Sequence, residues 1–189
     1  MPPHLRELEV QRTVAPDKDV DGLHPWNVGM MVRGEATFQP ATPYGIVELL
    51  LRNHIPLESQ EVVVVGYGDL VGVPLSIMMA QDSIRGNATV TITHIKTRDL
   101  AAHTRQADIL VAAAGVPQLI GAEMVKPGAT VIDVGVHRTP EGLVGDVRYE
   151  EVAEIAGAIT PVPGGVGPMT VAMLLVNTVA AAEAAAFGR

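Results

Sequence analysis

Residues 61–72 constrain the fold more than any other stretch of this sequence. They read Glu-Val-Val-Val-Val-Gly-Tyr-Gly-Asp-Leu-Val-Gly, and an apolar segment continues to Ala80. Four successive valines are typical of a buried parallel strand. A strand, a glycine turn and a helix in this order form the context of a dinucleotide-binding fingerprint. The spacing Gly-x-Gly-x-x-x-Gly is one residue longer than the usual motif, so an ordinary tight turn is the competing interpretation.

Three further runs have the character of strands, at residues 88–93, 108–115 and 129–135, and the last two end in glycine. We expect short elements at residues 150–157 (helix) and 158–160 (strand), and helices over residues 43–53 and 171–187. Thr42 is expected to cap the first of these two helices, with Pro43 at its first position. The last helix is expected to begin near Met169 or Thr170. The predicted fold is α/β, a Rossmann-like parallel sheet with flanking helices.

Composition excludes several classes of protein. The chain is 48% hydrophobic and 18% charged, with a net charge of −8 and no cysteine. These values argue against disorder, nucleic-acid binding, disulfides and thiolate catalysis. The six histidines are scattered, so we expect no metal site. The N-terminus lacks the apolar core of a signal peptide, and Asn177 and Glu183 interrupt the one membrane-like run. We therefore expect a cytoplasmic protein with no membrane partner.

The acidic turn at residues 17–22, Asp-Lys-Asp-Val-Asp-Gly, superficially matches a calcium loop. That loop requires a glutamate eleven residues after its first ligand, where this sequence has Val28. The calcium interpretation therefore fails. A solvated acidic turn remains one interpretation of the stretch.

Residues 160–170, here the signature segment, read Thr-Pro-Val-Pro-Gly-Gly-Val-Gly-Pro-Met-Thr. Prolines stiffen this segment, while glycines allow close approach of a ligand to the backbone. It resembles the C-terminal signature of the methylenetetrahydrofolate dehydrogenase/cyclohydrolase (FolD-type) family, which lines the cleft between folate and nicotinamide. The segments around Lys18, Thr42, Pro74, Lys126 and Asp133 are similar to the family's pattern in the same order. The resemblance runs from about Pro3 to the C-terminus.

The resemblance implies a set of site residues. Asp21, in the Asp-Val-Asp-Gly segment, would accept hydrogen bonds from the pterin ring, whose paired N–H donors suit a carboxylate. Pro163 and Gly164 would join it in binding substrate. Val134 and Val136 would contribute main-chain contacts to the nicotinamide amide. The full set of cofactor-binding candidates is Thr42, Gly66, Tyr67, Gly68, Leu70, Ile95, Val134, Val136, Gly167 and Thr170.

The implied cofactor is NADP or NAD, and the sequence weakens the preference for NADP. Tyr67 stands where many family members have arginine, Gly68 where they have serine, and Ile95 where they have serine. The usual partners of the adenosine 2′-phosphate are therefore missing, and Lys96 is the nearby basic group. We expect weak discrimination between the two nucleotides.

The implied activity is oxidation of 5,10-methylenetetrahydrofolate by hydride transfer to the nicotinamide, followed by hydrolysis of the methenyl product, in one-carbon metabolism and purine biosynthesis. The family's catalytic lysine lies in a Tyr-x-x-x-Lys motif, and this chain has no such motif among its three lysines. We therefore expect no catalytic residue in this chain and little or no turnover. A nucleotide-binding module without turnover is the alternative, and a structural assembly partner is a third, weaker one.

The same resemblance implies a division of the chain into three parts. Residues 1–30 would be a remnant of the N-terminal folate-binding domain and its linker, most of which is lacking. Residues 31–165 would form the NAD(P)-binding domain, and residues 166–189 a C-terminal helix that packs toward the missing domain. Family members are commonly dimers, so we expect a homodimer that acts on a small folate substrate.

Overall fold

A computed structural model describes residues 6–140 and 142–187. The predicted parts at residues 1–30 and 166–189 extend at their ends beyond the described residues, and the three-part division stays a prediction. The chain forms, in order, α1 (Glu7–Thr13), η1 (Pro16–Lys18), α2 (Pro25–Val32), α3 (Ala41–Arg52), β1 (Glu61–Val65), α4 (Gly72–Ala80), β2 (Thr89–Thr93), α5 (Leu100–Thr104), β3 (Ile109–Ala112), η2 (Ala122–Met124), β4 (Thr130–Asp133), β5 (His137–Thr139), β6 (Gly142–Val144), α6 (Tyr149–Ala153), β7 (Ala158–Ile159) and α7 (Val166–Phe187).

The strands form a parallel sheet in the order β2-β1-β3-β4-β7, and β5 and β6 form a separate antiparallel pair. The strand order reverses at β1, since β2 pairs on one side of it and β3 on the other. In open parallel sheets, ligands bind beyond the carboxyl ends of the strands at such a reversal. The fold thus places the carboxyl ends of β1 and β3 at the expected position of a site.

Alternating residues of β1 supply two hydrophobic cores, one on each face of the sheet. Val62 and Val64 belong to the core that includes residues of α2, α3 and α4. Val63 and Val65 belong to the core that includes residues near α6 and η2. Successive side chains of a strand point to opposite faces, so an unbroken valine run is expected where both faces are covered. The prediction of a buried central strand is confirmed.

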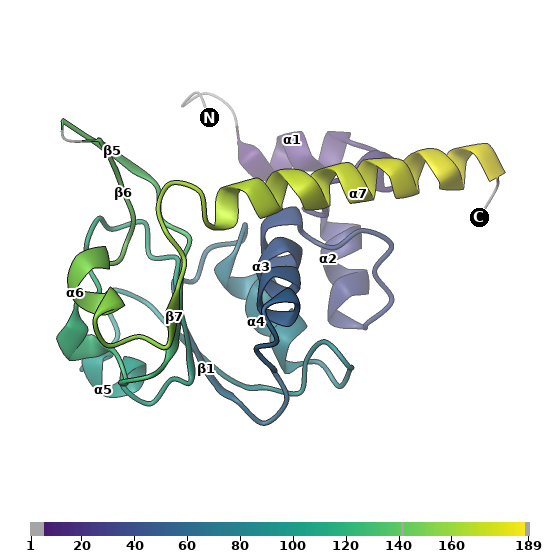
Figure 1. Ribbon diagram of the computed structural model, residues 1–189. Coiled ribbons are helices and arrows are strands. Elements are labelled where there is room, and N and C mark those ends of the chain that lie inside the picture. The colour runs from purple at the N-terminus through teal and green to yellow at the C-terminus, as the bar shows by residue number, and fades with distance from the viewer. Residues whose placement is uncertain (1–5, 141, 188–189) are drawn as a thin grey trace.

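Helix α7 packs against α3, as Figure 1 shows in yellow above the blue helix. The two helices approach closely at Gly45, where an added Cβ would lie 3.0 Å from the Cβ of Met169. The amide of the buried Asn177 donates to the carbonyl oxygens of Val20 and Gln39, at 2.8 and 2.9 Å. The N-terminal segment is therefore fastened to α7 as well.

Helix α7 also leaves an apolar stripe exposed, which includes Val171, Leu175 and Val179 at successive helical turns. By length and composition alone it is the one helix among the described residues that could cross a membrane, with a mean hydropathy of 1.6. A single such helix is weak evidence for a membrane span, and the expectation of no membrane partner stays a prediction.

Several element boundaries differ from expectation. Helix α7 begins at Val166, four residues before Thr170, so residues 166–170 of the signature segment are helical. The short helix α6 ends at Ala153 rather than at residue 157, and helix α1 was not expected at all. Pattern reasoning misses α1 because its seven residues carry no clear helical period of apolar side chains.

Candidate functional site

The glycine turn after β1 brings three elements into contact. Gly66 has φ +138°, and an added Cβ would lie 2.1 Å from the carbonyl oxygen of Ala113 at the end of β3. A Cβ at Gly72, the first residue of α4, would lie 2.0 Å from the carbonyl oxygen of Gly66. Only glycine fits at these two positions. A Cβ at Gly68, by contrast, would meet nothing within 4 Å, so the turn is open where a ligand would approach.

Two cavities lie side by side beyond the carboxyl ends of the strands. The glycine-turn cavity has a volume of about 470 Å³, and its lining residues are Gly68, Asp69, Leu70, Val71, Gly72, Ala113, Gly115, Val134, Gly135, Val136, His137 and Asp146. The signature-segment cavity has a volume of about 460 Å³, and its lining residues are Thr42, Leu70, Val71, Asp133, Val134, Val136, residues 161–168 and Thr170. The two cavities share Leu70, Val71, Val134 and Val136. The glycine turn and the signature segment therefore face one cleft.

Most of the candidate residues lie at this cleft. Leu70, Val134 and Val136 line both cavities, and Gly68 lines the glycine-turn cavity. The signature-segment cavity is lined by the candidates Thr42, Pro163, Gly164, Gly167 and Thr170. Gly66 lies directly behind the turn, buried against Ala113.

Thr42 is not a helix cap, contrary to expectation. Helix α3 begins at Ala41 with Pro40 at the cap position, so Thr42 lies inside the first turn. Its hydroxyl instead lies 3.0 Å from the hydroxyl of Thr170. The cap interpretation fails because Pro40 already sets the helix start, which frees the Thr42 side chain for a contact with α7.

Besides Gly66, three of the candidates line neither cavity. Tyr67 and Ile95 lie just beyond the ends of β1 and β2 and are 65% and 60% exposed. These two residues lie at the carboxyl ends of β1 and of the edge strand β2, where a Rossmann-type sheet places the adenosine half of a dinucleotide. Asp21 is exposed between η1 and α2. Among the described residues, no hydrogen bond or ion pair joins Asp21 to the signature segment.

Asp19, two residues before Asp21, is the structural carboxylate of the acidic turn. It is buried and accepts hydrogen bonds from the backbone N–H groups of Leu23 and His24, at 3.3 and 2.7 Å. The side-chain amide of Asn27 donates to it at 2.8 Å. The sequence alternative of a freely solvated turn is therefore wrong for Asp19, while Asp21 does face solvent.

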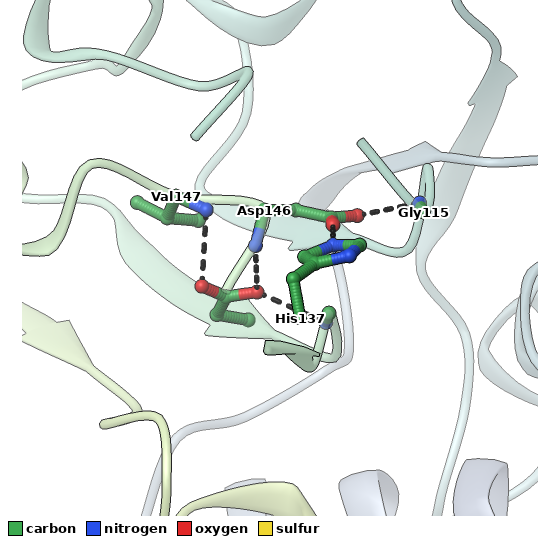
Figure 2. A network of polar contacts seen from close by, with 6 residues as sticks. Gly115, His137, Asp146 and Val147 are labelled. Carbon is green, nitrogen blue, oxygen red and sulfur yellow. Dashed lines mark hydrogen bonds and ion pairs between the residues drawn. The ribbon is translucent and has the colours of Figure 1, made fainter. Parts of the chain in front are cut away.

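Sequence reasoning also missed a buried carboxylate network, which Figure 2 shows. Asp133 ends β4 and accepts the backbone N–H groups of Gly135, Asp146 and Val147, at 3.0, 2.9 and 3.0 Å. Asp146 is fully buried; it accepts the N–H of Gly115 at 2.8 Å and lies 2.7 Å from Nε2 of His137. The network fastens the ends of β3 and β4 to the β5–β6 pair, next to Val134 and Val136.

The buried position of Asp133 changes its acidity. Burial raises the pKa of Asp133 to about 6, and the nearby charge of Asp146 acts in the same direction. The backbone N–H groups of Asp146, Val147 and Gly135 oppose this rise. The glycines on either side were the available sequence signal: a Cβ at Gly135 would lie 2.2 Å from Asp146, and one at Gly145 1.7 Å from Asp133.

The model of the tetrahydrofolate dehydrogenase/cyclohydrolase NAD(P)-binding domain matches residues 40–186. The chain belongs to this family. The expectations for family and fold, an α/β NAD(P)-binding domain with a parallel sheet, are confirmed.

Relatives in this tetrahydrofolate dehydrogenase/cyclohydrolase family are similar throughout the chain. The bifunctional protein FolD of Syntrophus aciditrophicus is 54% identical over 192 residues, which cover 98% of this chain and 66% of that protein. A 5,10-methylenetetrahydrofolate dehydrogenase of the silkworm Bombyx mori has a TM-score of 0.93 at 48% identity, over 98% of this chain and 66% of that one. The Trypanosoma brucei dehydrogenase-cyclohydrolase, solved with NADP and an inhibitor, has a TM-score of 0.90 at 39% identity, over 98% and 65%. The chain thus spans just under two-thirds of the length of these relatives.

A metal site has no support in the described part of the chain. No group of three or more His, Asp or Glu side chains within residues 6–140 and 142–187 could hold a metal ion. The expectation that this chain has no metal site stays a prediction.

Proposed function

We propose that this chain is the nucleotide-binding part of an enzyme that oxidises 5,10-methylenetetrahydrofolate with NAD(P) and hydrolyses the methenyl product. The observation that carries the proposal is the shared wall of the two cavities, formed by Leu70, Val71, Val134 and Val136. A nucleotide on the glycine turn and a folate against the signature segment would meet at this wall, since binding brings reacting groups into contact only when their sites adjoin.

The residues of the cleft fit a dinucleotide. The open space at Gly68 and the backbone N–H groups at the start of α4 suit a diphosphate. Val134 and Val136 would hold the nicotinamide through their main chains, and Thr42, Gly167 and Thr170 would close the other side. When bound, the nicotinamide supplies the hydride acceptor, and the chain's own task is to orient it and to exclude water. Asp21, Pro163 and Gly164 would contact the folate.

The second candidate is a nucleotide-binding module without turnover, and the positions of the lysines favour it for this chain on its own. Lys126 pairs with Asp108 at 2.6 Å, and Lys18 and Lys96 are exposed. None of the three lines either cavity. A general acid or base must lie within hydrogen-bond reach of the reacting group. The chain therefore lacks a lysine placed for that role.

Steady-state assays with 5,10-methylenetetrahydrofolate and either nucleotide separate the two candidates, with nucleotide binding measured independently by titration. We expect binding of NAD(P) with little or no turnover. Robust turnover would show that the family's lysine is dispensable. Failure to bind either nucleotide would overturn both candidates. We also propose weak discrimination between NAD and NADP, a homodimer, and a cytoplasmic location; the exposed Tyr67 and Ile95 support the first of these.

A further inference from the structure

The half-buried His137 and the fully buried Asp146 form a pair in the cleft that the proposed reaction does not use. Nε2 of His137 lies 2.7 Å from Oδ1 of Asp146, whose side chain is fully buried. Oδ2 of the same carboxylate accepts the N–H of Gly115 at 2.8 Å. An ionised carboxylate only accepts hydrogen bonds, so Nε2 of the imidazole carries the hydrogen.

Within residues 6–140 and 142–187, His137 is the one basic side chain that lines the glycine-turn cavity. The other ionisable groups on that lining are the carboxylates of Asp69 and Asp146. Asp133 lies directly behind them and accepts the backbone N–H of Asp146. The side chain of Arg138, next along β5, is exposed, and the facing strand β6 holds Gly-Leu-Val, which has no ionisable side chain.

This arrangement matters for a dinucleotide, because its diphosphate carries negative charge. The glycine turn that suits the diphosphate lines the same cavity as Asp69 and Asp146. Like charges placed together in a partly buried site repel, and an adjacent cation offsets the repulsion. Histidine is the side chain whose charge ordinarily changes between about pH 5 and 8. His137 is thus the side chain of this lining that could offset the negative charge around a bound diphosphate.

We propose that His137 is a positioning residue that couples nucleotide binding to proton uptake. The chain binds the dinucleotide more tightly when the imidazole of His137, hydrogen-bonded to Asp146, is protonated. The inference rests on the proposed nucleotide binding and adds a dependence on pH to it. By reciprocity, the bound nucleotide favours the imidazolium to the same extent as the imidazolium favours the nucleotide.

The test compares the unsubstituted chain with His137→Gln. Glutamine places an amide N–H close to the position of Nε2 and cannot change its charge in this range, so it keeps the bond to Asp146 and removes the titration. His103→Gln, on α5 and away from both cavities, is the matched control. NAD is the primary probe, since the 2′-phosphate of NADP itself titrates near about pH 6.

Affinity for NAD is measured by calorimetric titration between about pH 6.5 and 8.5, in two buffers of different ionisation enthalpy. For the unsubstituted chain and His103→Gln we expect Kd to rise about fivefold or more across this range, with proton uptake on binding. For His137→Gln we expect a nearly constant Kd and no uptake.

Two results would overturn the inference. The first is that the unsubstituted chain binds NAD with neither pH dependence nor proton uptake, a result that needs no variant. An unchanged pH dependence in folded His137→Gln would do so as well, and both results leave the proposed nucleotide binding intact. If the unsubstituted chain binds neither NAD nor NADP at any pH, the proposed function fails and the inference fails with it.

Discussion

The hydroxyl groups of Thr42 and Thr170 lie 3.0 Å apart and join the first turn of α3 to the second turn of α7. Both residues line the signature-segment cavity, so the N-terminal ends of two helices converge on it. The unpaired backbone N–H groups of a helix N-terminus favour negatively charged or hydrogen-bond-accepting ligands. The threonine pair fixes the relative position of these two ends.

The threonine pair predicts coupled effects on stability. Valine has nearly the same shape as threonine and lacks the hydroxyl, so we expect Thr42→Val and Thr170→Val each to lower the free energy of unfolding by about 1 kcal/mol. The double variant should cost little more than either single one, because both changes remove the same bond. Urea denaturation of the four proteins measures this, and strictly additive losses would contradict the bond's contribution.

The sequence predicted the centre of the fold well, since residues 61–72 satisfy local and tertiary requirements together. Four valines fit a strand covered on both faces, and Gly66 and Gly72 fit a strand and helix in backbone contact. The cofactor candidates that depend on this turn fall at the cleft for the same reason.

The features that the sequence did not predict depend on contacts between residues that are distant in the sequence. Local sequence indicates a helix cap at Thr42. It cannot show that the hydroxyl contacts Thr170 instead, because Thr170 lies 128 positions further along the chain. The role of Asp146 cannot be recognised from local sequence, because the sheet and the β5–β6 pair bring its partners Gly115 and His137 to it. Local patterns carry no information about such pairs.

The structure of the glycine turn predicts a large loss of stability for one alanine substitution and almost none for another. A methyl group at Gly72 would lie against the carbonyl of Gly66, and we expect Gly72→Ala to lower the free energy of unfolding by about 3 kcal/mol. A methyl group at Gly68 meets no atom within 4 Å, so Gly68→Ala should change stability by less than about 0.5 kcal/mol. Gly68→Ala should nevertheless weaken NAD(P) binding severalfold, as measured by titration, because it occupies the open side of the turn. Unimpaired binding would place the nucleotide elsewhere.

Asp133 predicts a specific dependence of stability on pH. Burial raises its pKa from 3.8 to about 6, so between these values the folded protein holds a proton that the unfolded chain has lost. Its contribution to the free energy of unfolding therefore decreases as pH rises through this window, by about 3 kcal/mol in total. We expect the difference in unfolding free energy between the unsubstituted chain and Asp133→Asn to decrease over that range.

Asp108 provides a control of opposite sign. The hydrogen bond from Lys126, with a second from the backbone of Glu61, holds its pKa below the ordinary 3.8. Its stabilising contribution is present above that value and is lost as pH falls through the lowered pKa. Chemical denaturation of Asp108→Asn should therefore differ from the unsubstituted chain in the acid range with the reverse slope. The same slope for both variants would contradict the assignment to Asp133.

Tyr67 and Ile95 predict how cofactor preference can be changed. We expect the ratio of NAD to NADP dissociation constants to lie within about tenfold of one in the unsubstituted chain, a gap of less than about 1.4 kcal/mol. Tyr67→Arg combined with Ile95→Ser supplies a guanidinium and a hydroxyl for a 2′-phosphate, and should strengthen NADP binding about tenfold with little effect on NAD. Tyr149→Arg, at an exposed tyrosine on α6, is the matched control. A native preference for NADP of about 100-fold would contradict the starting point.

The double hydrogen bond of Asn177 has a mechanical consequence. The side-chain amide of Asn177 donates to the carbonyl oxygens of Val20 and Gln39, so it couples the loop that bears Asp21 to α7. The close approach of the two helices at Gly45 couples α3 to α7 as well. Residues of α3 share a hydrophobic core with Val62 and Val64 of β1. Through α3, helix α7 and the loop that bears Asp21 are therefore held in a fixed position relative to the glycine turn, which follows β1.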